Sequence, residues 1–285
     1  MPGTDSASFS ELISLPRTLV MGIINTTPDS FSDGGKHFDP EVAIAAALEM
    51  LEAGADIVDV GGESARPGSA PVEPEEELRR AVPVIRGISQ HRPDAWISID
   101  TRRRIVAEAA IKGGARIIND ITGFRDDPSL VGLARETGAG LVVMHMLGKP
   151  KTMQQDISYN SFPGDIYDFF QERIRTLEAE GIDPDHIVID PGIGFGKTFE
   201  HNLMLINRLD LFRPLGKPIL IGPSRKAFIG KILDQPNPEE RVVGTLAVVT
   251  AAILRGASAV RVHDVPPAVQ ACKVADALVR ERVAS

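Results

Sequence analysis

The chain has 285 residues, of which 43% are hydrophobic and 25% are charged, so it can bury a substantial core and is not expected to be disordered. Its net charge of -8 argues against a general nucleic-acid binder, because neutralising phosphates requires a basic surface. Cys272 is the only cysteine, which excludes an intramolecular disulfide and a thiolate metal cage and fits a reducing cytosol. No apolar run approaches the roughly 20 residues that span a bilayer, and no signal peptide is recognisable. We therefore predict a cytoplasmic protein with no nucleic-acid or membrane partner.

Short runs rich in β-branched residues alternate with longer helical patterns along the chain. Strands are predicted at residues 18–25, 56–62, 96–100, 116–120, 141–146, 186–190, 218–224 and 259–264. Helical spacing of apolar residues is found at 40–54, 74–89, 103–114 and 200–216. This alternation predicts an α/β fold, a single-domain (β/α)₈ TIM barrel over residues 18–285, preceded by an N-terminal extension, residues 1–17.

The alternative fold is an open, doubly wound sheet. Such a sheet normally carries a glycine-rich fingerprint directly after its first strand. Here the first strand runs into Asn25-Thr26-Thr27-Pro28, which lacks that spacing, so the barrel is preferred.

Polar and charged residues stand where the predicted strands end. In a barrel, the carboxyl ends of the strands form the active face, so these side chains are expected to converge on one mouth. They are Asn25, Glu63 and Ser64, Asp100, Asn119 and Asp120, His145, Asp190, Ser224 to Lys226, and Arg261, His263 and Asp264. The plain alternative is that strand ends are simply polar: Asp120 and Asp264 could cap helices, and Glu63 could be a structural hydrogen-bonding group.

Two groups within this set suggest a ligand. Asp100 and Asp190, with Asn119, suit a heterocycle that presents N–H donors and a carbonyl on one edge, although two carboxylates could also hold a divalent metal. The second group lies at the last two strands, the usual phosphate corner of a barrel, and predicts an anionic ligand unless its members only form salt bridges on a solvated rim. That group comprises Ser224, Arg225, Lys226, Arg261 and His263. Lys226 could alternatively be a Schiff-base nucleophile.

Two long segments, 26–40 and 64–74, are rich in Gly, Pro, Ser and Asp. Loops of this composition form turns, and loops of this length on an active face are typical lids, although ordinary connectors stay possible.

Eight segments together resemble the dihydropteroate synthase family, from about residue 18 to about residue 280. They are MGIINTTPDSFSDGG (21–35), GGESARPGS (61–69), ISIDT (97–101), INDITG (118–123), VVMHMLGKPKTMQ (142–154), DPGIGFGKTFEHNL (190–203), GPSRKAFIG (222–230) and VRVHDV (260–265). The resemblance implies a transferase of folate biosynthesis and a sulfonamide target. It would condense 6-hydroxymethyl-7,8-dihydropterin pyrophosphate with p-aminobenzoate to give 7,8-dihydropteroate and pyrophosphate. It also implies Mg²⁺ as cofactor and a homodimer.

The resemblance also implies residue roles. The pterin would contact Asp100, Asn119, Met144, Asp190, Phe195, Gly222 and Lys226. Asn25, Arg261 and His263 would hold the pyrophosphate, with Asn25 also binding the metal. Phe31, Arg66, Pro67 and Ser224 would form the p-aminobenzoate site. Asp33 would complete the metal and substrate site on loop closure and, with Asp100, Asp190 and Lys226, belong to the catalytic set.

One position departs from the family pattern, and rival functions follow from shared features. Ala65 stands where the family usually has Thr, which removes one hydroxyl near the phosphate or the second substrate. A pterin-dependent methyltransferase would use the same barrel and the same Asp–Asn–Asp contacts. Such an enzyme would have no need of the SRKAFIG and DSFSDGG segments, which are both present here. A Schiff-base aldolase would work through Lys226. A non-catalytic pterin-binding protein would be expected to lose Asn25, Arg261 or His263, all of which are present.

Overall fold

The computed structural model describes residues 8–27, 39–66 and 68–281, and its strands and helices alternate along the chain. The strands are β1 Leu19–Asn25, β2 Ile57–Gly61, β3 Trp96–Asp100, β4 Ile117–Asp120, β5 Gly140–Met144, β6 Ile187–Asp190, β7 Leu220–Ile221 and β8 Ala259–Val262. The α-helices are α1 Phe9–Ile13, α2 Pro40–Glu52, α3 Pro74–His91, α4 Arg104–Lys112, α5 Ser129–Thr137, α6 Gly164–Ala179, α7 Phe199–Asn207, α8 Ala227–Leu233, α9 Val242–Leu254 and α10 Val265–Arg280. Short 3₁₀ turns cover Pro184–His186, Leu209–Leu215 and Pro238–Arg241.

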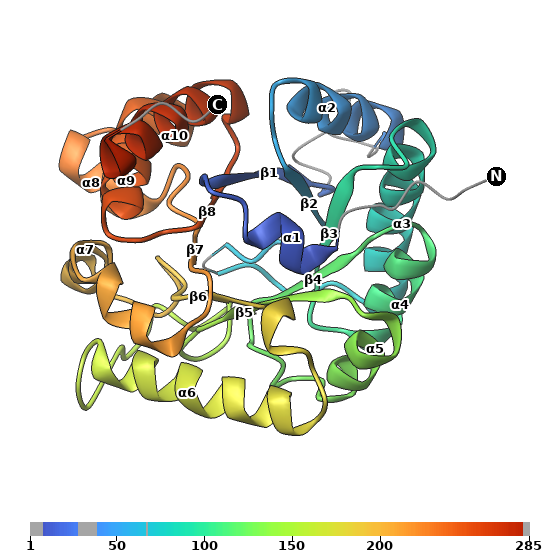
Figure 1. Cartoon of the computed structure of the whole chain (residues 1–285), viewed down its shortest axis with the longest axis horizontal. Helices are drawn as coiled ribbons and strands as arrows, with labels where there is room; N and C mark the ends of the chain where they lie inside the picture. The colour runs from blue at the N-terminus through green and yellow to red at the C-terminus, as the bar shows by residue number, and fades with distance from the viewer. Residues whose placement is uncertain (1–7, 28–38, 67, 282–285) are drawn as a thin grey trace.

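The strands form one parallel sheet that curls into a barrel. Their order is β6-β5-β4-β3-β2-β1-β8-β7, and a bridge between Ile189 and Ile219 joins the two ends of this series. Figure 1 shows the helices as a ring outside the strands. Because β1 pairs with both β2 and β8, the chain runs once around a barrel and does not wind outwards from a central strand. The predicted TIM barrel is confirmed, and the doubly wound alternative is wrong.

Two predicted elements differ most from the sequence pattern. Strand β7 covers only two residues of the predicted range 218–224. It lies between Pro218 and Pro223, and prolines cannot donate to a strand ladder. The predicted helix 200–216 divides into α7 and a 3₁₀ turn, Leu209–Leu215, that contains Pro214. Proline lacks the N–H that a continuing α-helix needs.

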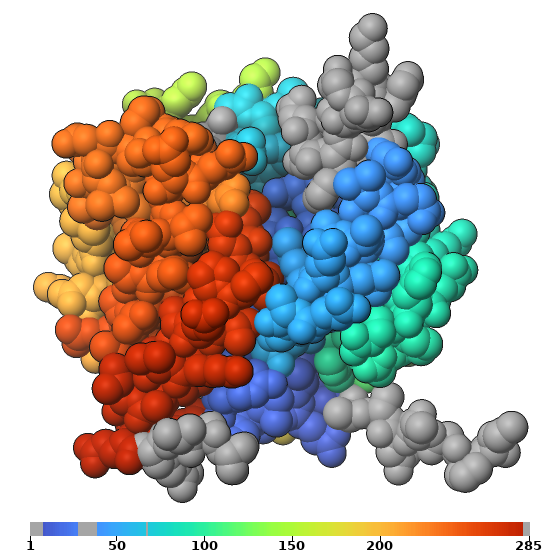
Figure 2. Space-filling view, turned by 90° about the horizontal axis from the view of Figure 1, so that it is seen from above, coloured from blue at the N-terminus to red at the C-terminus, as the bar shows by residue number. Residues whose placement is uncertain are grey.

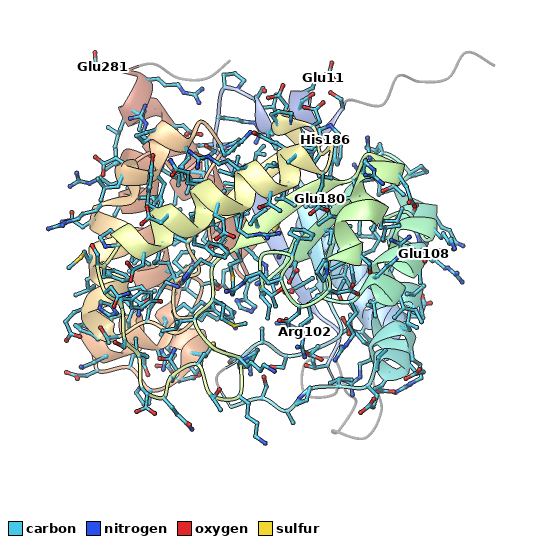
Figure 3. The ribbon with its side chains drawn as sticks, turned by 90° about the horizontal axis from the view of Figure 1, so that it is seen from below. Glu11, Arg102, Glu108, Glu180, His186 and Glu281 are labelled. Carbon is cyan, nitrogen blue, oxygen red and sulfur yellow. The ribbon has the colours of Figure 1, made fainter. Side chains whose placement is uncertain are left out.

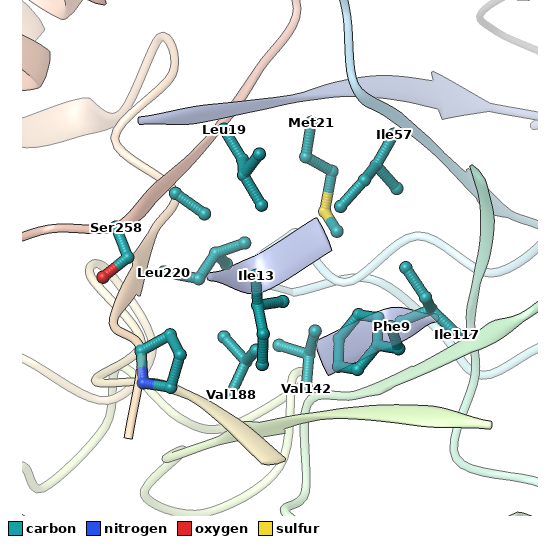
Figure 4. A pocket seen from close by; sticks show the side chains of 12 residues that line it. Phe9, Ile13, Leu19, Met21, Ile57, Ile117, Val142, Val188, Leu220 and Ser258 are labelled. Atoms are coloured by element: carbon teal, nitrogen blue, oxygen red, sulfur yellow. The ribbon is translucent and has the colours of Figure 1, made fainter. Parts of the chain in front are cut away.

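The barrel interior is apolar at the amino ends of the strands, and α1 closes this end. Met21, Ile57, Val142 and Leu220 belong to a buried cluster that also contains Phe9 of α1. Figure 4 shows these side chains pointing toward one another beneath α1, around a cavity of about 10 Å³. A helix within residues 1–17 therefore packs on this end of the barrel, and its apolar side chains leave the polar chemistry to the other end.

The two ends of the barrel are chemically different. In Figure 3, Glu11 and His186 lie at the end that α1 covers, whereas Arg102, which follows β3, lies at the opposite end. The carboxyl ends of all eight parallel strands open at the second end. Among the described residues, no helix is both long and apolar enough to cross a membrane.

Candidate active site

Strand register places the predicted pterin residues in neighbouring rows at the open end of the barrel. Asp100 on β3 is in register with Asn119 on β4, and Met144 on β5 is in register with Asp190 on β6. Asn119, Met144 and Asp190 are buried, whereas the Asp100 side chain keeps 16% of its surface exposed. Alternation along a strand sends these residues inward, so parallel pairing brings them together although the sequence separates them.

Arg261 of β8 is bound to carboxylates across the interior. Its Nε lies 2.6 Å from Oδ2 of Asp59, and its Nη2 lies 2.9 Å from Oδ2 of Asp100. Nδ2 of Asn119 donates to the same Asp59 oxygen over 3.0 Å. Asp59 was not among the residues predicted from the sequence, although a lone carboxylate within the apolar run Ile57–Gly61 indicates a specific partner.

Burial shifts the proton affinities of the two predicted catalytic carboxylates. It raises the pKa of Asp100 to about 7, an effect that the nearby Arg261 opposes. Burial likewise raises the pKa of Asp190 to about 6, although the Gly192 N–H donates to its Oδ1 over 2.7 Å. Both groups therefore titrate near neutral pH, where a small change in surroundings alters their charge.

Lys226 lies against the predicted pterin wall. Its Nζ is 4.2 Å from the centre of the Phe195 ring. Burial lowers the pKa of Lys226 to about 8, and the charges of Asp190 and Asp100 oppose that shift. The ammonium group thus lies against an aromatic face and feels the charges of the two carboxylates without an ion pair to either within the described residues.

His145 does not join this group. It is buried beside Lys197, whose Nζ lies 3.0 Å from Nδ1 of His145 and also donates to the Phe195 carbonyl over 3.0 Å. Burial lowers the pKa of His145 to about 2 and that of Lys197 to about 7. The pair ties the segment after β6 to the end of β5. Lys197 was not singled out from the sequence, where it reads only as the end of a glycine-rich turn.

Asn25, Ser224 and His263 form a second cluster beside Arg261. Nδ1 of His263 is 2.9 Å from Oγ of Ser224, and Nε2 is 3.4 Å from Nδ2 of Asn25. Burial and the charges of Arg261 and Arg225 lower the pKa of His263 to about 3, so the ring is neutral. Because Nδ2 of Asn25 faces Nε2, we assign the ring proton to Nδ1, from which it is donated to Ser224; Ser224 also accepts from the His263 backbone N–H. The Ser224 hydroxyl hydrogen is therefore left to donate to a ligand.

Several other strand-end residues have structural partners. Arg225 is bonded through two nitrogens to Asp264, at 3.0 and 2.7 Å, so it is not a free cation of the phosphate corner. Asp120 accepts from the backbone N–H groups of Thr122 and Phe124 and holds the turn after β4. Glu63 forms ion pairs with Arg102 and Arg103 at the rim. These contacts are structural, but neither Asp120 nor Asp264 caps a helix through its side chain: Asp264 stands at the N-cap of α10 without a side-chain hydrogen bond to that helix, and Asp120 holds a turn.

Comparison with known proteins gives a consistent result. A family model described as "Pterin binding enzyme" matches residues 21–263. A dihydropteroate synthase of Synechocystis sp. is 48% identical over 264 residues, covering 93% of this chain and 91% of the relative. The chain belongs to the dihydropteroate synthase family.

Solved structures of dihydropteroate synthases share the fold. The Yersinia pestis enzyme in complex with a sulfonamide drug superposes with a TM-score of 0.87 at 42% identity, covering 94% of this chain and 96% of that one. The Xanthomonas albilineans enzyme in complex with 7,8-dihydropteroate gives a TM-score of 0.83 at 40% identity, covering 92% and 94%. The family, the enzyme class and the function in folate biosynthesis expected from the sequence are confirmed, and these relatives are synthases, not pterin-dependent methyltransferases.

The second-substrate residues expected of a dihydropteroate synthase are described only in part. Phe31, Asp33 and Pro67 lie outside the described residues. Arg66 is exposed on the segment after β2. Ala65, the departure from the family pattern, packs with Phe195 against a buried cluster that includes Met144, Met146 and Met153. A methyl group suits that apolar surface, whereas a threonine hydroxyl there would need a partner.

The metal expected of a dihydropteroate synthase has one predicted protein ligand. Among the described residues, no group of three or more His, Cys, Asp or Glu side chains is placed to hold a metal ion. Asn25 donates through its amide nitrogen to His263, which leaves the amide oxygen as a hard donor. Mg²⁺ usually keeps several waters and binds through one or two protein oxygens plus substrate phosphates, so this donor set fits an ion held mainly by a pyrophosphate.

Proposed function

We propose that this enzyme joins 6-hydroxymethyl-7,8-dihydropterin pyrophosphate to p-aminobenzoate at the open end of its barrel. The observation that carries the proposal is the meeting of Asp100, Asn119 and Asp190, which offer hydrogen-bond acceptors, with the Arg261 guanidinium. A pterin presents N–H donors along one edge, and its pyrophosphate requires cations. The 7,8-dihydropteroate in the Xanthomonas albilineans structure supports this product.

The pterin ring would lie over the buried carboxylates. Asp100, Asn119 and Asp190 would accept from its N–H groups, and Lys226 would reach the ring from beside Phe195. Met144, Phe195 and Gly222 would shape the pocket.

The pyrophosphate would bind beside the ring, next to Asn25, Arg261 and His263. The bond between the pterin methylene carbon and the ester oxygen breaks, and its electron pair leaves with the pyrophosphate. Arg261 stabilises the charge that develops on that leaving group. The carboxylates of Asp100 and Asp190 stabilise the positive charge left on the conjugated methylene. The aryl amine then forms the new C–N bond, and its proton passes to the departing pyrophosphate or to water. Because the aryl ammonium group is acidic, no strong general base is needed.

We propose Mg²⁺ as the cofactor, with Asn25 as its protein ligand. When bound, the ion neutralises pyrophosphate charge and makes pyrophosphate a better leaving group. The residues of the chain keep their own tasks: Asn25 orients His263 through its amide nitrogen, and Arg261 supplies the fixed positive charge.

The p-aminobenzoate site is proposed to include Ser224, Arg66, Phe31 and Pro67, with Asp33 completing the metal and substrate site. Support comes from Ser224, whose hydroxyl hydrogen is not committed to His263 and can donate to a carboxylate. The sulfonamide in the Yersinia pestis structure supports the same expectation for drugs of that class.

A homodimer is proposed through α8 and α9. Helix α9 contains no charged residue and exposes an apolar stripe at helix spacing, which consists of Val243, Ala247, Ala251 and Leu254. Ile232 and Leu233 of the adjacent α8 are also exposed. Figure 2 shows this region in orange on one flank, beside α10 in red. Apolar surface of this kind is typical of protein–protein contacts, and a second copy of the chain would cover it symmetrically. Sedimentation should show a dimer, and Val243→Glu should give a monomer; a monomeric parent chain contradicts the proposal.

The cytoplasmic location stays a prediction.

The reaction is tested by measuring pyrophosphate release from the pterin ester, with and without p-aminobenzoate. Release that depends on p-aminobenzoate, with dihydropteroate formed in equal amount, is expected. Steady release without the aryl amine would indicate a hydrolase, and no release under either condition would refute the proposal.

A further inference from the structure

Asp59 is a buried carboxylate to which the reaction described above assigns no contact. Its side chain is fully enclosed, and Ile57, Val58 and Val60 surround it along β2. Oδ2 of Asp59 accepts from Nε of Arg261 on β8 and from Nδ2 of Asn119 on β4. Its other oxygen, Oδ1, has no hydrogen-bond partner within the part of the chain that the structure describes. The two residues that hold Asp59 are therefore Arg261, which is proposed to bind the pyrophosphate, and Asn119, which is proposed to bind the pterin.

We propose that Asp59 is a positioning residue that fixes the orientations of Arg261 and Asn119 before the pterin pyrophosphate binds. This inference rests on the proposed function. In the barrel order, β2 lies midway between β4, which carries Asn119, and β8, which carries Arg261. The Asp59 carboxylate, which can only accept hydrogen bonds when ionised, therefore reaches both side chains.

The guanidinium geometry explains the effect on Arg261. The group is planar, so a bond at Nε to Asp59 and one at Nη2 to Asp100 fix the direction of the remaining Nη1 donors. These donors are then available to an anion. Without Asp59, the plane can rotate about the remaining bond to Asp100, and the donors lose their fixed direction.

The amide geometry explains the effect on Asn119. An amide can present either its oxygen or its nitrogen after a half-turn, and only its surroundings decide which. Because Asp59 accepts and cannot donate when ionised, it holds the Asn119 nitrogen and leaves the oxygen for the N–H groups of a pterin. Without Asp59, the Asn119 amide could reverse, and its NH₂ group would then face the N–H groups of the pterin, so that no hydrogen bond could form.

The same anion acts on Asp100 through its charge. The charged groups that act on Asp100 include Arg261 from β8, Asp59 from β2, Glu77 from α3 and Asp120 from β4, and Lys226 before α8 also interacts with it through its charge. Arg261 lowers the pKa of Asp100, whereas the three carboxylates raise it. Removing the charge of Asp59 therefore lowers the pKa of Asp100, and the acid limb of activity moves to lower pH. A residue that only filled space would leave that limb in place.

The test compares Asp59→Asn with Ser98→Ala. Ser98 is in register with Asp59 on the adjacent strand, is equally enclosed, and has an Oγ with no partner within the described part of the chain, so it is a matched control. In Asp59→Asn, the KM for the pterin pyrophosphate should rise about tenfold or more, as expected for lost hydrogen bonds to charged groups. The KM for p-aminobenzoate should change less than about twofold. Ser98→Ala should behave as the parent enzyme in both measurements and in the pH profile.

Calorimetry separates the two routes. Asp59→Asn should weaken binding of the pterin that lacks phosphates through Asn119, and weaken the ester more through Arg261. If Asp59→Asn does not fold, the comparison is made in the Arg261→Gln background, which leaves no arginine charge unpaired. In the Arg261→Gln background, Asp59→Asn should weaken binding of the pterin and binding of its pyrophosphate ester equally. A greater loss for the ester in that background would overturn the route through Arg261.

Two further outcomes overturn the inference as a whole: unchanged KM for the pterin pyrophosphate in a folded Asp59→Asn enzyme, or an acid limb that does not move. Both are distinct from failure of the proposed function, in which the parent enzyme itself releases no pyrophosphate with p-aminobenzoate.

Discussion

Replacing Asp190 by Asn tests whether a buried carboxylate stabilises positive charge on the pterin methylene. The substitution keeps the side-chain volume, and the new amide oxygen can still accept from the Gly192 N–H that now donates to Oδ1 over 2.7 Å. Only the negative charge is lost. Because burial raises the pKa of Asp190 to about 6, the parent carboxylate is ionised at pH 8, where the two enzymes should be compared.

The size of the effect follows from Coulomb's law. Two unit charges about 4 Å apart attract by about 4 kcal/mol at an effective dielectric constant of about 20. The dipole of the new amide offsets part of this lost attraction, which leaves about 3 kcal/mol. That corresponds to a loss of about 10²-fold in kcat, because the interaction strengthens as positive charge develops.

The assay is steady-state pyrophosphate release over a range of Mg²⁺ concentrations. The Mg²⁺ concentration for half-maximal activity should stay the same, since Asn25 and the pyrophosphate hold the ion in the proposed site. Asp185→Asn, an exposed carboxylate at the closed end of the barrel, is the matched control and should retain full activity. If high Mg²⁺ restores most of the rate of Asp190→Asn, the carboxylate is a metal ligand and the reasoning is refuted.

Much of this site could be predicted from the sequence, because strand ends in a parallel barrel converge on one face. Asp100, Asn119 and Asp190 end their strands, so their meeting needed only the alternation of strands and helices. Resemblance to a family then supplied their roles. The barrel itself was predictable for the same reason, apart from the short β7, where flanking prolines limit the ladder.

What the sequence could not provide is the pairing of charges across the interior. Asp59 and Arg261 are 202 positions apart, and nothing local to either residue indicates the other. Arg225 resembles a phosphate-binding cation until Asp264, 39 positions away, is found bonded to it. Lys197 and His145 form a buried pair only because the segments after β5 and β6 pack together. Such partners depend on barrel closure, and closure is a property of the whole chain.

Three more predictions test other parts of the structure. Arg261→Ala should weaken the pterin pyrophosphate by about 2–3 kcal/mol more than the pterin without phosphates, as a lost charge-assisted bond to an anion requires; equal losses in calorimetry would contradict the assignment. Phe9→Ala should lower the free energy of unfolding by about 3 kcal/mol, because Phe9 is buried against the barrel 5.9 Å from the Trp96 ring, while kcat at the far end is retained; urea unfolding that matches the parent chain would show that α1 does not stabilise the barrel. The pH profile of kcat/KM should be bell-shaped, since this ratio reports the groups of the free enzyme. Activity should fall as the pH drops through about 7, where Asp100 takes up a proton and loses its negative charge, and it should also fall above about 8, where Lys226 loses its positive charge. The maximum therefore lies between these values, and a flat profile from pH 6 to 9 would mean that neither charge contributes to capture of the substrate.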